Sequence, residues 1–291
     1  MRMPLLAGLS LLLLSAAVAA APATVSAVNM PAWLERASQA RPLLPGQVLQ
    51  SGDLLRTGQG GRVLLSLPEG SQIKLGEAAV FRVDKLNAED GRRSPFTTAV
   101  DVLKGAFRFT TALVAKARQR EIDVRVATIT AGIRGTDLWG KADEERDLVC
   151  LLEGRIAVSH EGDGGFQEMN EPLSFFVAPK GKPALPLAKV EAEKVDKEWA
   201  PQTELQAGRG VSRTDGKWRL VVASAADQDE TLRWYDSLRA AGYAAKVKPI
   251  GTHAYRVSLE QLASEADAQA LGEQLKATLG TPLSQVLPMA K

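Results

Sequence analysis

Short stretches of alternating hydrophobic and polar residues dominate the chain between residues 24 and 178. The run IDVRVATIT (residues 122–130), for example, places Val124 and Val126 on one face and Asp123 on the other. This period of two is what a half-buried antiparallel strand requires. Many short strands of this kind predict an all-β domain over residues 24–178, built from antiparallel hairpins in a sandwich or a rolled sheet.

Glycines interrupt three of these runs in the same way. Gly70, Gly105 and Gly154 each follow a charged residue and lie between two apolar, strand-like stretches. Because glycine adopts a positive φ at little cost, each position is typical of a tight turn. The pattern therefore predicts three similar hairpins, with turns at these three glycines.

The pattern changes after residue 178. Residues 179–216 are rich in proline, lysine, glutamate and glycine, which predicts a linker, with a short helix-compatible piece at Val190–Trp199 that can pack back on the β domain. Residues 217–291 then predict, in order, a strand at 218–224, a helix at 229–242, strands at 243–250 and 253–262, a helix at 264–280 and a strand at 282–288. This βαββαβ order predicts a small α+β domain in which two helices cover one face of a four-stranded sheet.

The first residues have a pattern of their own. Residues 1–21 combine a basic residue, Arg2, with a leucine-rich run and a series of small residues. The apolar run is shorter than the roughly 20 residues that a membrane-spanning helix needs. This predicts a cleavable secretory signal and a periplasmic protein. Because no later stretch is apolar enough to span a bilayer, we expect no stable membrane insertion after cleavage.

The charge balance argues against a nucleic-acid partner. The chain has 36 Lys and Arg against 34 Asp and Glu, a formal net charge of +2. The βαββαβ order also occurs in RNA-binding sheets, but their signature of closely spaced aromatics flanked by basic residues and glycine is missing. We therefore expect no nucleic-acid partner.

The sequence offers little material for catalysis. The histidines are His160 and His253, in different predicted domains, and Cys150 is the single cysteine. No HExxH, CxxC or GxSxG motif supplies the positioned acid, base, nucleophile or metal ligands that a reaction needs. We expect a non-enzymatic protein without metal or cofactor. Cys150 lies in an apolar run and is expected in the core, although a cross-strand approach of His160 stays open.

The stretch TAGIRGTDLW (residues 130–139) suggests either a phosphate-binding loop or a structural corner. A phosphate loop needs a following helix whose N-terminus meets the anion, and here a polar loop and a strand follow. We therefore predict a strand that turns a corner, with Gly132 and Gly135 relieving the backbone. Arg134 and Asp137 are expected to pair or to cap backbone groups. The apolar residues expected to face inward are Ile133, Leu138 and Trp139.

Several segments together resemble the FecR domain family. Residues 45–77 contain the Gly-Asp and Thr-Gly steps and a Gly-Ser hairpin, residues 127–139 contain AGIRGT, and residues 151–159 contain a glycine-centred strand pair. The resemblance implies an exported all-β module that contacts a protein partner, here an unidentified envelope protein. The residues that it marks as the structural signature of the family are Gly132, Ile133, Arg134, Gly135 and Thr136.

The C-terminal segment resembles a SPOR (sporulation-related) domain. The matching pieces are WRLVVAS, LRAAGYAAKV and YRVSLEQLASEADAQALGEQL, within residues 217–288. The resemblance implies binding of peptidoglycan glycan strands, especially strands stripped of peptide stems, across the open face of the sheet. The chain departs from the family at the glutamine and Gly-Ser-Phe positions of the first strand, and Leu259-Glu260-Gln261 stands where the family has Gly-Pro-Phe.

Residues suited to carbohydrate are those that offer a flat apolar ring or a hydrogen-bonding group. Tyrosines at strand edges also commonly pack under helices, and this alternative stays open for Tyr243 and Tyr255. The candidate glycan-binding residues are Trp218, Ser224, Tyr243, Tyr255 and Arg256.

Two functions follow from the resemblances. In the first, the C-terminal domain tethers the β domain to cell-wall glycan, with enrichment at the division septum as a further expectation. In the second, the chain is a periplasmic regulator of transmembrane signalling, of the iron-transport type for which the FecR family is named. Those regulators carry a cytoplasmic segment and a membrane helix before the periplasmic part. The predicted signal at the start of this chain counts against direct control of a sigma factor.

Overall fold

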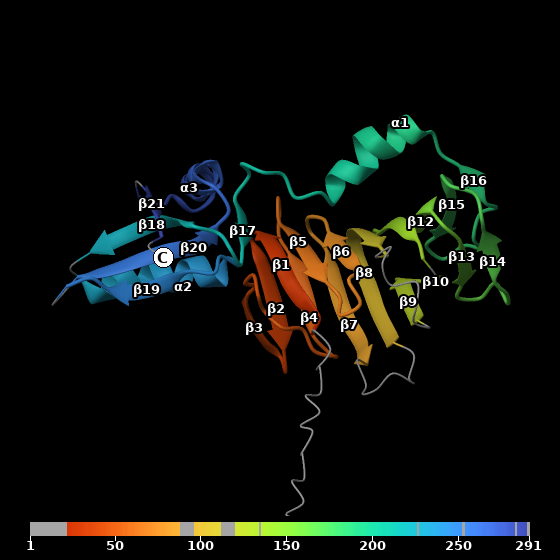
Figure 1. The fold of residues 1–291 in the computed structure, drawn as a ribbon, viewed down its shortest axis with the longest axis horizontal. Coiled ribbons are helices and arrows are strands. Elements are labelled where there is room, and N and C mark those ends of the chain that lie inside the picture. Colours follow the sequence, from red (N-terminus) through yellow and green to blue (C-terminus); the bar gives the residue numbers. More distant parts are fainter. Residues whose placement is uncertain are drawn as a thin grey trace, which may run out of the picture.

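The computed structural model describes residues 22–87, 96–111, 120–133, 135–225, 227–251, 254–282 and 284–289. The predicted signal at residues 1–21 lies outside the described residues. The described chain is mostly β (Figure 1), and its helices belong to the predicted linker and the C-terminal part. They are α1 (Ala192–Lys194), the π-helix η2 (Val195–Trp199), the 3-10 helix η3 (Ala200–Gln202), α2 (Gln228–Ala240) and α3 (Glu265–Leu279). None of these helices is long and apolar enough to cross a membrane.

Two sheets build the N-terminal part. The first has the order β1-β5-β6-β8-β11-β12-β15-β16 and the second the order β3-β2-β4-β7-β8-β9-β10-β13-β14. The first sheet contains β1 (Thr24–Asn29), β5 (Arg62–Ser66), β6 (Gln72–Leu75), β8 (Phe96–Thr110), β11 (Asp137–Ala142), β12 (Arg146–Glu153), β15 (Ser174–Pro179) and β16 (Ala188–Lys189). The second adds β2 (Ala32–Arg36), β3 (Gln39–Pro42), β4 (Leu54–Thr57), β7 (Val80–Asn87), β9 (Arg120–Val126), β10 (Ile129–Ile133), β13 (Ile156–His160) and β14 (Gln167–Met169).

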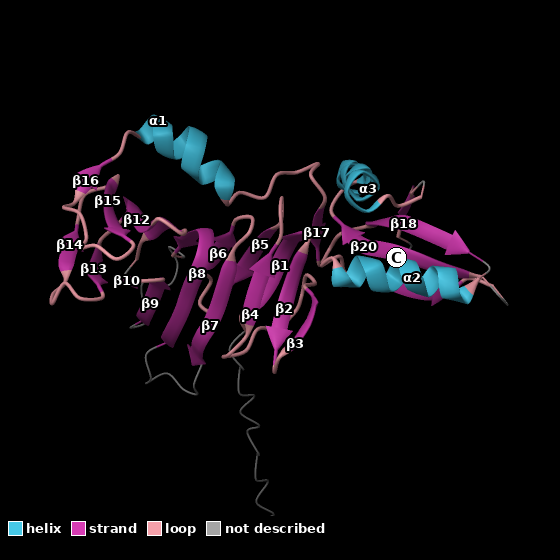
Figure 2. Ribbon diagram, turned by 180° about the vertical axis from the view of Figure 1, so that it is seen from behind, coloured by secondary structure: helices cyan, strands magenta, loops and turns pink. Residues whose placement is uncertain are grey.

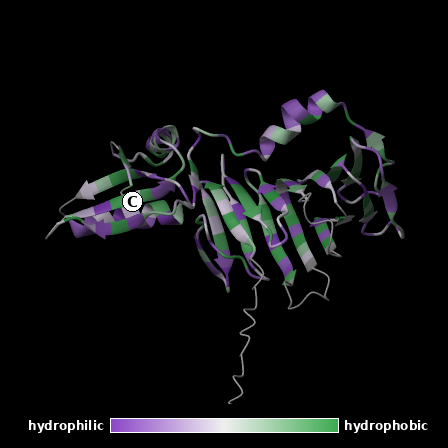
Figure 3. Cartoon of the chain, in the orientation of Figure 1, coloured by the Kyte–Doolittle hydropathy of each residue, from purple (hydrophilic) through white to green (hydrophobic). Residues whose placement is uncertain are grey.

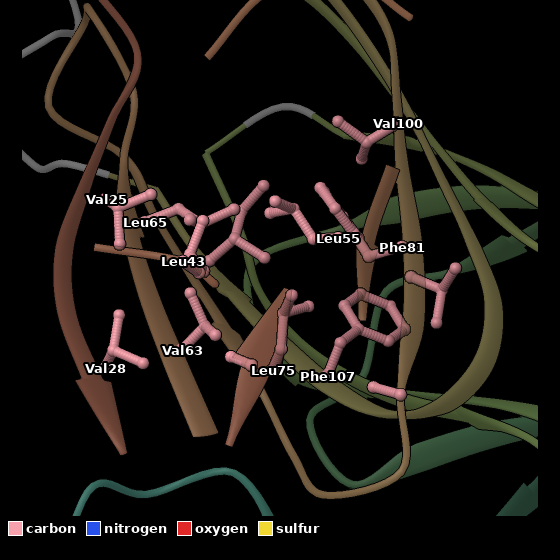
Figure 4. Close-up of a cluster of buried hydrophobic side chains, with 14 of the residues drawn as sticks. Val25, Val28, Leu43, Leu55, Val63, Leu65, Leu75, Phe81, Val100 and Phe107 are labelled. Carbon is pink, nitrogen blue, oxygen red and sulfur yellow. The ribbon is translucent and has the colours of Figure 1, made fainter. Parts of the chain in front are cut away.

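The core fills the space between the two sheets. Along the strands, hydrophobic and hydrophilic positions alternate (Figure 3), so that each strand buries one side. Figure 4 shows side chains from both sheets pointing toward one another. Val63, Leu75 and Phe107 come from the first sheet, and Leu55 and Phe81 from the second. The all-β prediction for this part is therefore confirmed.

Strand β8 belongs to both sheets, which corrects the predicted hairpin at Gly105. Its first half pairs with β7 and β9, and its second half pairs with β6 and β11. Gly105 has φ +90° at the bend between the halves, and an added Cβ would lie 2.6 Å from the Ala79 Cα. The glycine lets one strand bend from one sheet into the other rather than turn back. The pairing of β8 with β9 is parallel, so this part is not purely antiparallel.

The predicted hairpin at Gly70 is confirmed, whereas the one at Gly154 is wrong. Strands β5 and β6 pair around Gly70, with Ser66 opposite Gln72. Strand β12, before Gly154, pairs with β11 and β15 in the first sheet, but β13, after it, pairs with β10 and β14 in the second. Gly154 is a corner at which the chain changes sheets.

The helical turns at residues 192–202 cover the outer face of the first sheet. Trp199 stacks on Trp139, with ring centroids 4.9 Å apart and planes 14° apart, and meets the Phe175 ring edge-on at 6.2 Å. Glu204, which follows, forms ion pairs with Lys74 at 2.6 Å and Arg108 at 3.2 Å. Aromatic stacking and these ion pairs fasten the linker to the sheet.

The C-terminal part has the predicted βαββαβ order. Its sheet runs β19-β20-β18-β21, from β18 (Trp218–Ala225), β19 (Lys246–Pro249), β20 (Tyr255–Leu262) and β21 (Gln285–Pro288). Helix α3 is capped as the sequence predicts: the Ser264 hydroxyl accepts a hydrogen bond from the Asp267 N–H, and Gly280 is left-handed at φ +65°.

A short strand joins the two parts. Strand β17 (Val211–Arg213) pairs with β1 over Ala27–Asn29 and also with β20, where Ser212 lies opposite Leu262. The first sheet therefore continues through β17 into the C-terminal sheet, as Figure 1 shows.

Candidate functional site

The two helices of the C-terminal part lie on the same face of its sheet. Leu220 of β18 contacts Gly272 of α3, and its partner in the ladder is Leu259 of β20. Tyr255, on the same side of β20 as Leu259, shares a hydrogen bond with Gln228 of α2. In Figure 2 helix α2 lies in front of this sheet and runs along its strands. No helix of the described residues covers the opposite face.

Strand register defines which side chains lie on this open face. Arg256, Ser258 and Glu260 alternate with the helix-facing residues of β20, and residues paired directly with them share their face. Lys246 lies opposite Ser258, and Lys248 lies opposite Arg256. The open face comprises Arg219, Val221, Ser224, Lys246, Lys248, Arg256, Ser258, Glu260, Gln285 and Leu287.

A carboxylate shared by two lysines organises one side of the open face. The Lys246 Nζ lies 3.0 Å from one Glu260 oxygen, and the Lys248 Nζ lies 3.0 Å from the other. Burial acts to raise the pKa of Glu260, but the hydrogen bonds and charges of the two lysines outweigh it and hold the pKa below its ordinary value. Glu260 is therefore a charged anchor for both lysines.

Two arginines lie on the two inner strands of the face, toward opposite ends. Arg219 on β18 and Arg256 on β20 are half-buried, and within the described part of the chain neither forms an ion pair. Their Nε atoms are enclosed and have no hydrogen-bond partner among the described residues. The face thus carries four cationic side chains against one carboxylate, which suits an anionic ligand.

The structure divides the five candidate glycan-binding residues between the two faces. Ser224 and Arg256 are paired with each other on the open face. Trp218 lies on the same side as Leu220 and packs against the core. Tyr255 also faces the helices, and Tyr243 is buried, with its hydroxyl accepting a hydrogen bond from Gln274 at 3.2 Å. The three aromatic candidates are therefore not part of the open face.

The lysine pair and Glu260 were not among the predicted site residues. The signal is present in the sequence, because Lys246 and Lys248 are two apart, as are Arg256, Ser258 and Glu260. A period of two on adjacent strands places such residues on one face.

The AGIRGT stretch forms the corner between β10 and β11. Gly135 has φ +69°, and a Cβ added to Gly154 would lie 2.5 Å from the Gly135 carbonyl oxygen, so the two corners are in contact. The buried Thr136 donates its hydroxyl to the Arg155 carbonyl at 3.2 Å. Gly132 lies in β10, and Ile133 is buried in the core. The prediction of a strand that turns a corner is confirmed.

The neighbouring residues of this stretch also have structural roles. The prediction of an inward-facing side chain is confirmed for Leu138, which is buried between the sheets. It is wrong for Trp139, which is buried on the opposite face, under Trp199. Asp137 pairs with Arg108, with contacts of 2.9 and 2.7 Å. Arg134 lies outside the described residues.

The FecR-like Gly-Asp and Thr-Gly steps also stabilise the fold. Asp53 is buried and accepts two hydrogen bonds from Arg36, at 2.7 and 2.6 Å, and one from the Gln50 N–H at 2.8 Å. The buried Thr57 hydroxyl donates to the Gly76 carbonyl and accepts from the Ala79 N–H. These side chains are occupied in holding strand ends together.

The possible catalytic residues are separated. Cys150 is buried in β12 of the first sheet, and burial raises the pKa of its thiol to about 12. His160 lies in β13 of the second sheet and contacts Asp163 at 3.1 Å. His253 lies outside the described residues. Among the described residues, no group of three His, Cys, Asp or Glu side chains could hold a metal ion.

Comparisons with known proteins agree with this architecture. The FecR protein family model matches residues 53–157, and the SPOR domain model matches residues 214–284. Both are non-catalytic, envelope-associated domain families; SPOR domains bind peptidoglycan, and FecR domains function in signalling.

Similarity beyond the two domain families is distant. No curated protein matches the chain. Two crystal structures of a candidate anti-sigma factor from Parabacteroides distasonis ATCC 8503 are similar over 82% of this chain and 99% and 98% of theirs, at 13% sequence identity and TM-scores of 0.41 and 0.40. By the two family matches, the chain contains a FecR domain followed by a C-terminal SPOR domain.

Proposed function

We propose that this chain is a non-enzymatic periplasmic protein that binds peptidoglycan glycan strands through its SPOR domain and an envelope protein through its FecR domain. The observation that carries the proposal is a SPOR domain whose sheet has one face that no described helix covers and that is lined mainly by polar and charged side chains. An extended polymer can lie across such a face and contact several strands at once.

The same proposal assigns a role to each segment. Residues 1–21 serve as the export signal, residues 24–178 as the partner-binding FecR domain, residues 179–216 as the linker and residues 217–291 as the glycan-binding domain. The FecR signature residues that the structure describes hold strand ends and corners together. We therefore expect the partner to contact other residues of this domain.

Sedimentation with purified cell-wall sacculi tests the glycan-binding role. The mature protein should sediment with sacculi, and more of it should do so after an amidase has removed the peptide stems. A variant with Arg256→Gln should sediment less, whereas Arg233→Gln, an exposed change on the helix-covered side, should not. Failure to sediment with amidase-treated sacculi would refute the proposal.

A second candidate function is regulation of transmembrane signalling, which the FecR match favours. Cross-linking in living cells distinguishes the two. Recovery of an inner-membrane sensor or an outer-membrane receptor joined to the FecR domain would support signalling. A fluorescent fusion in dividing cells tests the septal enrichment expected of a protein that binds stem-free glycan.

A further inference from the structure

The open face of the SPOR sheet is more cationic than the chain as a whole. The complete chain has a formal net charge of +2, but this one face gathers four basic side chains and a single carboxylate. No aromatic ring of the described residues lies on it, because Trp218 and Tyr255 face the helices. The face therefore lacks the flat apolar surface that neutral sugars commonly stack on.

The lysine side chains stay partly exposed although both form ion pairs with Glu260. The Lys246 and Lys248 side chains are 41% and 49% exposed, whereas Glu260 between them is 4% exposed. One carboxylate cannot neutralise two ammonium groups. The pair therefore keeps an excess positive charge that faces solvent along the edge strand β19.

Arg256 extends this charge toward the centre of the sheet. It lies opposite Lys248 on one side and Ser224 on the other. Lys246, Lys248 and Arg256 thus form one cationic cluster on the neighbouring strands β19 and β20. Arg219 lies apart from these three cations, toward the other end of β18 from Ser224 and opposite Leu287 of the other edge strand.

Building on the glycan-binding role proposed above, we infer that this face recognises the free lactyl carboxylates of N-acetylmuramic acid in stem-free glycan strands. When an amidase removes the peptide stem, the lactyl amide becomes a carboxylate, so each muramic acid gains a negative charge. In the stem-bearing strand, the same carbonyl is part of a neutral amide. The cluster of Lys246, Lys248 and Arg256 therefore distinguishes the two glycan strands at the atom where they differ.

The energetics favour this distinction over recognition of sugar hydroxyls. Hydrogen bonds that involve a charged partner are roughly twice as strong as those between two neutral groups. Arginine can bind a carboxylate through two parallel hydrogen bonds, and the half-exposed lysines act as point charges beside it. Ser224, which is exposed on the same face, then orients the sugars.

Binding of matched tetrasaccharides to the mature protein tests the inference. One ligand has two disaccharide units with free lactyl carboxylates, and the other has the same carboxylates capped as methylamides. The wild-type chain should bind the acid form about tenfold more tightly. This preference should shrink between about 0.05 M and about 0.5 M salt, because the Debye length shortens.

Variants assign the preference to the named side chains. The triple variant K246Q/K248Q/E260Q removes the lysine pair without leaving a buried carboxylate unpaired, and it should lose most of the preference. R256Q should lose part of it. The control R233Q/K276Q removes two exposed cations from the helices and should behave as wild type.

Glu260→Gln gives a change in the opposite direction. Removing the internal counter-charge leaves both lysines for the ligand, so the acid form should bind about threefold more tightly while the methylamide is unaffected. A purely structural role of Glu260 would weaken binding of both ligands alike.

The outcomes separate this inference from the proposed function. Equal affinity for the acid and the methylamide would overturn the inference and leave glycan binding intact. A preference that survives in the triple variant would overturn the assignment to the lysine pair. No binding of either ligand would overturn both proposals.

Discussion

At the residue scale, Gly135 and Gly154 share a left-handed backbone but differ in their surroundings. No atom lies within 4 Å of a Cβ added to Gly135, whereas one added to Gly154 would lie 2.5 Å from the Gly135 carbonyl oxygen. Gly135→Ala should therefore cost about 1 kcal/mol of unfolding free energy, from backbone conformation alone. Gly154→Ala should cost about 3 kcal/mol, because the corners must also move apart. Urea unfolding measures both.

The same pair tests whether the FecR signature is structural. Gly135→Val, with a branched side chain at positive φ, should cost more than Gly135→Ala and should lower the yield of folded protein. A Gly135→Val variant with wild-type stability that loses only partner binding would contradict the structural role.

Cys150 should be unreactive in the native protein. Its thiol is fully buried, and burial raises its pKa to about 12, so almost no thiolate exists near neutral pH. Because the chain has one cysteine, any signal from a thiol reagent comes from this residue. Modification should appear only when denaturant unfolds the chain. Rapid labelling of the native protein would show that β12 opens locally.

Glu260 should contribute to stability in a pH-dependent way. Its pKa is held below the ordinary value of 4.5 by Lys246 and Lys248, so the folded state favours the charged form. This contribution is complete above the unfolded pKa and is lost as pH falls through the lower folded pKa. Unfolding free energies measured between about pH 6 and about pH 2.5 should therefore fall less steeply for Glu260→Gln than for wild type. Parallel curves would contradict the ion pairing.

At the element scale, the helical turns at residues 192–202 act as a strap over the first sheet. Trp199 is the side chain that joins strap and sheet, through Trp139 and Phe175. Trp199→Ala should cost about 2 kcal/mol, from lost apolar burial and stacking. Released from the sheet, the strap should be cut faster by trypsin at Lys194 and Lys197. Lys197→Ala, which removes only an exposed ion pair with Glu193, is the matched control for stability and should cost less than about 0.5 kcal/mol.

The sequence predicts elements better than it predicts their partners. The helices and strands of the SPOR domain and the corner at AGIRGT follow from periodicity, caps and glycines, which are local signals. The hairpins predicted at Gly105 and Gly154 are wrong because a glycine between two apolar runs looks the same in a hairpin, a bend or a sheet crossing. Which sheet a strand joins depends on contacts distant in sequence, such as that between Gly105 and Ala79.

The candidate site shows the same limit. The sequence is enough to predict that Arg256 and Glu260 share one face of β20, because they are an even number of residues apart, and that Lys246 and Lys248 share one face of β19. That Trp218 faces the helices depends on its sharing a side with Leu220, and that Tyr243 is buried depends on its contact with Gln274 of α3. Residue type alone favoured the rings, whereas the fold exposes the charges.

At the scale of the whole molecule, the FecR and SPOR domains share a strand. The β17 ladder to β1 is reinforced by the Ser212 hydroxyl, which donates to the Val28 carbonyl at 3.0 Å. On the SPOR side, Asp267 of α3 accepts hydrogen bonds from the N–H groups of Gly210 and Val211. The last residues of the linker are thus fixed to both domains, which gives the two domains a defined relative orientation.

A second contact lies beside the shared strand. Trp33 of β2 covers Gly242, which follows α2, so closely that a Cβ there would lie 2.6 Å from the ring. The indole N–H donates to the Ala240 carbonyl at 3.3 Å, and the Ala32 N–H donates to the Gly242 carbonyl at 3.1 Å. If β17 were the single connection, the two domains could still rotate about this strand. The Trp33 ring, packed against Gly242, opposes that rotation.

Trp33→Ala should therefore loosen the junction without unfolding either domain. Removing the half-buried ring should weaken the contact by about 2 kcal/mol, and β17 should remain paired. Spin labels at Gln72→Cys and Glu273→Cys, exposed positions in the two domains, report the distance between them, and the buried Cys150 should stay unlabelled. The distance distribution should be narrow in the otherwise wild-type chain and broad with Trp33→Ala. Trp199→Ala removes the same type of ring from the strap and should leave the distribution narrow. An equally broad distribution in all three chains would show that the domains are not held in one orientation, and glycan bound by the SPOR domain would then not fix the position of the FecR domain.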